Sequence, residues 1–203
     1  MEGSFSNYHL VVALLIFLPL IHFSTTASAA RALSSAITNT EFIRTSCSTT
    51  TYPELCYTSL SSQATTIRSD PKLLAHAALS VSLETATSTS LLMAKLSQSH
   101  GMTAREVGAM HDCIEELSDS VYQLKNSMAE MPQLNGPNFA LTVNDIQTWV
   151  SAALTDDDTC MEGFAGKVMN GNTKFAVREQ IVNVAHITSN ALALINSFAS
   201  LHG

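Results

Sequence analysis

Residues 149–164 read W-V-S-A-A-L-T-D-D-D-T-C-M-E-G-F, and this stretch decides how the chain folds. It holds the single Trp and the last of four Cys, beside three consecutive Asp. Within this stretch and on both sides of it, small or apolar side chains recur at the three- and four-residue spacing of a buried helix face: Val143, Ile146, Val150, Ala153, Cys160, Phe164 and Val168. Asp157 occupies the position that keeps this spacing between Ala153 and Cys160. The stretch predicts a packed helix over 142–169, in which Trp149 anchors the core. The three carboxylates lie next to Cys160, which we expect to hold the helix in place.

Three more long helices are predicted around this one. Asp70 followed by Pro71 is typical of a helix start, and this helix extends to Gly101 with a seam rich in small residues. Thr103 and Glu106 have the spacing of a capping box, which opens a helix that Pro132 ends. The clearest period of the chain lies on this helix: Val107, Met110, Ile114, Leu117, Val121, Leu124, Met128 and Met131. A last helix follows residues 172–173 and continues with apolar positions to Phe198.

Four long amphipathic helices joined by short turns predict an all-α fold, an up-down-up-down four-helix bundle over residues 70–203. A short helical hairpin is predicted before the bundle, over 40–61, because Pro53 suits the first position of a short helix that follows an apolar turn. No strand pattern of comparable length is present. The hairpin and bundle together form one predicted domain, residues 30–203.

The N-terminal end predicts a secretory signal peptide. A Leu-rich, uncharged run over 10–23 precedes the small-x-small site Ala27-Ser28-Ala29, so we expect residues 1–29 to be removed. The run is short for a membrane span, and we expect no membrane association of the mature form. Without Glu2 the chain has 16 acidic and 10 basic residues, a net charge of about −6, which favours a basic protein partner over nucleic acid.

The cysteines Cys47, Cys56, Cys113 and Cys160 all lie in the predicted mature chain. An even number in a secreted protein favours two disulfides, and four cysteines allow three pairings. Their spacing contains no C-x2-C pair, so we expect no metal site. The chain also lacks G-x-S-x-G, H-E-x-x-H and phosphate-binding glycine motifs, and we expect no cofactor and no enzymatic activity. Glu115 and Asp119 share one convex helix face, whereas a catalytic pair of carboxylates converges across a cleft.

Four blocks of sequence resemble the plant invertase and pectin methylesterase inhibitor family. They are T-Y-P-E-L-C from Thr51, D-C-I-E-E-L-S-D-S-V-Y-Q-L from Asp112, the stretch 149–164, and N-A-L-A-L-I-N from Asn190. The resemblance covers nearly the whole mature chain. It implies a four-helix bundle after a helical hairpin, with disulfides Cys47–Cys56 and Cys113–Cys160. It also implies secretion to the apoplast and cell wall.

The resemblance also implies a target enzyme and contact residues. The D-D-x-T-C-x-x-G-F form of the third bundle helix is more similar to inhibitors of pectin methylesterase, and the Pro-Lys-Phe motif of invertase inhibitors is absent, so invertase is the alternative partner. Composition alone favours a solvated turn for the acidic run, whereas the resemblance favours an enzyme contact. The implied contact residues are Thr159, Glu115 and Asp119, and the other acidic candidates of the stretch are Asp156, Asp157, Asp158 and Glu162.

Overall fold

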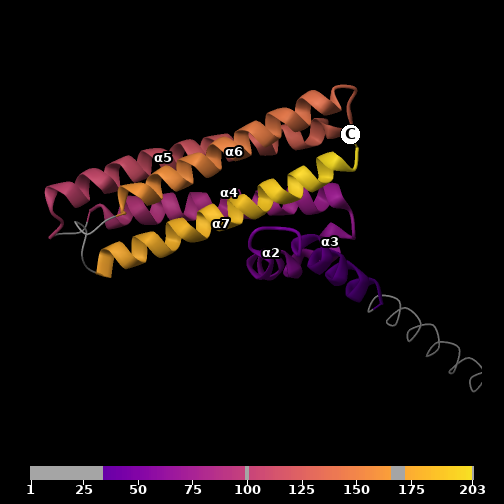
Figure 1. Ribbon diagram of the computed structural model, residues 1–203, viewed down its shortest axis with the longest axis horizontal. Coiled ribbons are helices and arrows are strands. Elements are labelled where there is room, and N and C mark those ends of the chain that lie inside the picture. Colours follow the sequence, from indigo (N-terminus) through magenta and orange to yellow (C-terminus); the bar gives the residue numbers. More distant parts are fainter. Residues whose placement is uncertain (1–33, 99–100, 166–171, 203) are drawn as a thin grey trace, which may run out of the picture.

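The computed structural model describes residues 34–98, 101–165 and 172–202, and within these ranges it contains helices and no strand. The bundle helices are α4 (Pro71–Leu96), α5 (Ala104–Glu130), α6 (Phe139–Gly163) and α7 (Asn172–Ser200). They alternate in direction, with α5 packed along α6 and α4 along α7 (Figure 1). The all-α, up-down-up-down prediction is confirmed. The predicted signal peptide, residues 1–29, lies outside the described residues.

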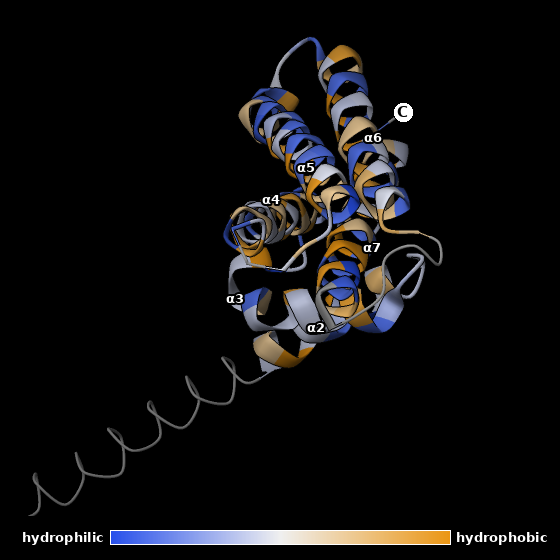
Figure 2. Cartoon of the chain, turned by 90° about the vertical axis from the view of Figure 1, so that its left-hand side faces the viewer, coloured by the Kyte–Doolittle hydropathy of each residue, from blue (hydrophilic) through white to orange (hydrophobic). Residues whose placement is uncertain are grey.

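A hairpin precedes the bundle, as predicted, but its first helix is already present at residue 34, before the predicted start at residue 40. Residues 34–47 are helical and are followed by α2 (Pro53–Leu60), which has Pro53 at its first turn. The 3-10 turn η1 (Ser61–Gln63) and the short α3 (Ala64–Ile67) then lead to α4. In an end-on view α2 and α3 lie beneath α4 and α7, and each bundle helix carries both polar and apolar residues (Figure 2).

The helix starts follow local chemistry. Asp70 accepts hydrogen bonds from the backbone N–H groups of Lys72 and Leu73 at the start of α4. The Thr103 hydroxyl accepts from the Glu106 N–H at 3.3 Å, while the Glu106 carboxylate accepts from the Thr103 N–H at 2.7 Å. The capping box predicted for α5 is therefore present, and its hydrogen bonds lower the pKa of Glu106.

The predicted seams are only partly correct. On α5, Val107 is 49% exposed, because the buried stripe instead passes through Cys113, Ser120 and Ser127. On α4 the buried stripe is made of small and polar positions, including Ser82, Ala86 and Thr89. Trp149 is only partly buried. A prediction from hydrophobicity alone does not find these buried stripes, because small polar residues allow helices to pack closely, as small apolar residues do.

Helix α6 begins three residues earlier than predicted and ends at Gly163 instead of continuing to 169. Phe164 leaves the helical conformation and packs, 1% exposed, in an apolar cluster with Cys113 and Cys160. Between α5 and α6, the 3-10 helix η2 (Met131–Asn135) lies at the other end of the bundle.

The sequence suggested no segment of transmembrane length after the N-terminal run, but one bundle helix has the length and composition of a membrane span. It is the part of α7 over Lys174–Ser200, and 56% of its apolar window is buried inside the bundle. Burial of that kind is typical of a core helix.

Candidate functional site

The acidic turn of α6 is held against α5 by a disulfide. Cys113 and Cys160 are bonded with their Cα atoms 4.3 Å apart, and Cys47 is bonded to Cys56 in the hairpin. These are the two pairings that the family resemblance implies. Successive residues of a helix point about 100° apart, so Asp156, Asp157 and Asp158 face three different directions. The turn therefore has one inner face and two outer flanks.

Asp157 forms the inner face and is 0% exposed. This burial contradicts its prediction as a partner-binding residue, because a side chain without surface cannot contact another protein in this fold. Burial raises the pKa of Asp157 to about 7, against the opposing effect of the Ser120 and Thr188 hydroxyls. The spacing that placed Asp157 between Ala153 and Cys160 indicated an inward position, and that pattern was the better guide.

Asp157 belongs to a buried polar layer between α5, α6 and α7. Ser120 on α5 and Thr188 on α7 lie beside Asp157, and all three are fully buried. Ser82 on α4 is also 0% exposed. No described residue forms a regular hydrogen bond with the side-chain oxygens of these four residues.

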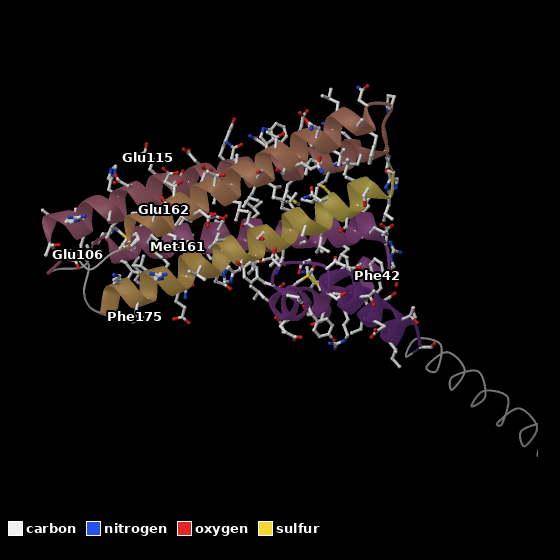
Figure 3. The ribbon with its side chains drawn as sticks, viewed as in Figure 1. Phe42, Glu106, Glu115, Met161, Glu162 and Phe175 are labelled. Atoms are coloured by element: carbon white, nitrogen blue, oxygen red, sulfur yellow. A yellow bond between two sulfur atoms is a disulfide. The ribbon has the colours of Figure 1, made fainter. Side chains whose placement is uncertain are left out.

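Asp156 lies on the flank of the acidic turn that faces α5. Burial, and then the nearby carboxylates of Glu116 and Asp119, raise the pKa of Asp156 to about 6. Glu115 and Asp119 are exposed on α5, where Figure 3 shows Glu115 projecting outward. We call Glu115, Asp119 and Asp156 the α5–α6 acidic surface. The structure thus brings together three of the predicted contact residues.

The other predicted contact residues lie elsewhere on the turn. Thr159 is exposed on the outward side of α6, with its hydroxyl donating to the Thr155 carbonyl oxygen at 2.8 Å. Asp158 and Glu162 are exposed and lie toward α7, and Met161 points from α6 toward α7 in Figure 3. Thr159 therefore separates two acidic flanks, one beside α5 and one beside α7.

Beside the α7 flank is a cavity of about 160 Å³, which we call the α6–α7 pocket. Asp158 and Met161 line it from α6, His186 lines it from α7, and Tyr52 closes it from the loop before α2. The rings of Tyr52 and His186 are stacked with centroids 3.6 Å apart. Sequence reasoning missed Tyr52 and His186, because their separation along the chain gives no signal of contact.

The chemistry of the site is that of a binding surface. Within the described ranges, no group of three or more His, Cys, Asp or Glu side chains is arranged to hold a metal ion. The carboxylates of the turn point in diverging directions, so they do not converge on one reacting atom. A rigid helix turn with charged flanks and an exposed Thr159 is suited to contact a complementary protein surface.

Comparisons with known proteins agree with this description. The sequence model of the family described as "Plant invertase/pectin methylesterase inhibitor" matches residues 41–194. The chain is 48% identical over 174 residues to the "21 kDa protein" of Daucus carota, covering 84% of this chain and 90% of that protein. It is 47% identical over 166 residues to "Pectinesterase inhibitor 10" of Arabidopsis thaliana, covering 80% of this chain and 53% of the relative.

A solved structure has the same fold. It is a mutant form of a pectin methylesterase inhibitor from Arabidopsis, which aligns with a TM-score of 0.60 at 19% identity and covers 74% of this chain and 92% of that chain.

Proposed function

The chain belongs to the plant invertase/pectin methylesterase inhibitor family, and from this premise we propose that it inhibits pectin methylesterase. In this proposal the protein is not an enzyme. It is secreted to the cell wall, forms a one-to-one complex with the esterase, and covers the cleft that binds pectin. Pectin then keeps its methyl esters because it cannot reach the catalytic carboxylates. The similarity to a pectinesterase inhibitor at 47% identity is the observation that carries the proposal.

Features of the described residues support an inhibitor that works by steric cover. One disulfide closes the hairpin and the other links α5 to α6, which reduces the ordering cost of binding. Thr159, Glu115 and Asp119 are exposed on adjacent helices, where they are free to contact an enzyme. Carboxylates at such a surface favour a basic partner and orient its approach. The predicted signal peptide and the disulfides support secretion.

A paired inhibition assay tests the target. The mature chain is titrated against a plant pectin methylesterase and, separately, against cell-wall and vacuolar invertases. We expect esterase activity to fall until about one inhibitor is present per enzyme, with invertase activity unchanged. Full esterase activity at a stoichiometric excess would contradict the proposal, and inhibition of invertase alone would establish the alternative that the family description allows.

A matched pair of variants tests the contact surface. Thr159 and Thr148 are both exposed on α6, and each donates its hydroxyl to the carbonyl oxygen four residues earlier, at 2.8 and 2.9 Å. We expect Thr159→Trp to weaken inhibition at least about tenfold, because it adds bulk at the proposed contact. Thr148→Trp, three turns away, should inhibit as the wild type does, and both should keep the helical circular dichroism signal. Equal inhibition by the two variants would remove Thr159 from the interface.

A further inference from the structure

The α6–α7 pocket has the size of a single side chain. Its volume of about 160 Å³ is well below the roughly 300 Å³ at which small-molecule sites begin. Apolar side chains of Leu154, Met161 and Ala185 form part of its wall, while Asp158 and His186 supply polar groups. The pocket therefore suits an amphipathic side chain with an apolar stem and a polar end.

The charge of the pocket selects a cation. The Asp158 side chain is exposed and forms no hydrogen bond or ion pair with another described residue. Burial lowers the pKa of His186 despite the opposing effect of Asp158, so the imidazole stays neutral over more of the acidic range. Asp158 is then not neutralised within the pocket, and an entering cation would be its counter-ion.

The aromatic wall of the pocket is held in position. The Tyr52 N–H donates to the Asn190 side-chain oxygen at 3.0 Å, and the Asn190 amide nitrogen donates to the Tyr52 carbonyl oxygen, also at 3.0 Å. These two bonds fix the loop before α2 to α7 and support the stacked pair of Tyr52 and His186. Planar aromatic surfaces beside a carboxylate suit a guanidinium group better than an ammonium group, because the guanidinium stacks and donates in one plane.

We propose that the α6–α7 pocket binds an arginine side chain of the partner enzyme, with the guanidinium against the Tyr52–His186 pair and bonded to Asp158. This inference rests on the proposed function, because it assigns the arginine to the esterase. It adds a second contact to the complex, on the flank of α6 opposite the α5–α6 acidic surface. Thr159 would lie between the two contacts.

A probe titration tests the pocket without the enzyme. N-acetyl-arginine methylamide is added to the full mature chain while the imidazole proton signals of His186, assigned with the variant His186→Gln, are followed by NMR. We expect weak, saturable shifts. N-acetyl-citrulline methylamide, which has the same shape without the charge, should bind at least about tenfold more weakly, as expected for the loss of a charge-assisted hydrogen bond. Equal shifts with both probes, or none with either, would overturn the proposal.

Inhibition of the esterase tests the source of the arginine. Asp158→Asn should require about ten times more inhibitor for half inhibition, whereas Asp145→Asn, which removes the same charge elsewhere on α6, should behave as the wild type. If the wild type inhibits and Asp158→Asn inhibits equally well, the pocket proposal is wrong while the proposed function stands. If the wild type fails to inhibit, the proposed function and the enzyme as arginine donor are both overturned, and the probe titration still decides whether the pocket binds arginine.

Discussion

The inner face of the acidic turn and its outer flanks contain the same residue type in opposite environments. Asp157 is fully buried in the polar layer, whereas its neighbours Asp156 and Asp158 reach the two sides of α6. On the flanks Asp158 is exposed and Asp156 keeps part of its surface, so a carboxylate there can meet a partner. In the layer the carboxyl group has lost water without gaining a charged partner among the described residues, so its neutral form is favoured. The position of each Asp on the helix, and not its residue type, therefore determines whether it has a structural role or is available to bind a partner.

The largest effect is expected from removing the disulfide that holds both faces together. The Cys113–Cys160 bond spans 47 residues, and the double variant Cys113→Ser/Cys160→Ser should lower the free energy of unfolding by about 4 kcal/mol in the loop-entropy account. The matched variant Cys47→Ser/Cys56→Ser removes a bond across nine residues and should cost about 2.5 kcal/mol. Urea unfolding measures both values. In Cys113→Ser/Cys160→Ser, backbone amide hydrogen exchange should become faster at both Asp157 and Thr159. Faster exchange at only one of them would mean that the inner face and the outer side of the turn are held independently.

The next effect concerns the inner face and depends on pH. The pKa of Asp157 is about 7 in the folded chain and near 3.8 when unfolded, so the folded state binds its proton more tightly between these values. The free energy of unfolding should therefore be greatest in acid and fall as pH rises from about 4 to 7, by a few kcal/mol. Asp156 contributes a smaller change of the same sign, since its pKa is raised to about 6 at a more exposed position.

Asp157→Asn tests this pH dependence, because the amide has the shape of the neutral acid and does not ionise. Its free energy of unfolding should vary much less between pH 4 and 7, and the variant should be more stable than the wild type at pH 8. Asp145→Asn, on the same helix, should keep the wild-type slope. Denaturant unfolding at each pH gives the comparison, and an unchanged slope in Asp157→Asn would show that Asp157 is not the responsible group.

The sequence predicted the fold well because the fold depends on long periodic helices and their ends. Asp70, Thr103 and Pro53 each mark a helix start by local chemistry, which needs no knowledge of the rest of the chain. The buried stripes were harder to predict. Ser82 and Ser120 are polar by type but lie in the core, where their small size allows helices to pack closely. Only the arrangement of all four helices decides which of several possible stripes faces inward.

The candidate site was less predictable for the same reason. Thr159, Glu115 and Asp119 were proposed from a resemblance, and their exposure is consistent with that role. Asp157 was assigned to the surface although the spacing of α6 pointed inward, because three consecutive acids suggested one shared role. Tyr52 and His186 meet through the packing of the hairpin loop on α7, a contact between distant segments that no local pattern encodes.

The smallest effect is expected on the outer flank, through the rate of association. Glu115→Gln/Asp119→Asn should slow binding to the esterase several-fold at low salt and reduce its dependence on salt, because exposed carboxylates act over about 10 Å at 0.1 M ionic strength. Glu54→Gln/Glu84→Gln removes the same two charges from exposed positions on α2 and α4. Stopped-flow association at increasing salt separates two explanations. If both double variants slow binding equally, the net charge of about −6 of the predicted mature chain attracts the enzyme, and the α5–α6 acidic surface has no special role. If only the first variant slows binding, the surface itself orients the approach, and the contrast between the buried and exposed carboxylates of the turn extends to function.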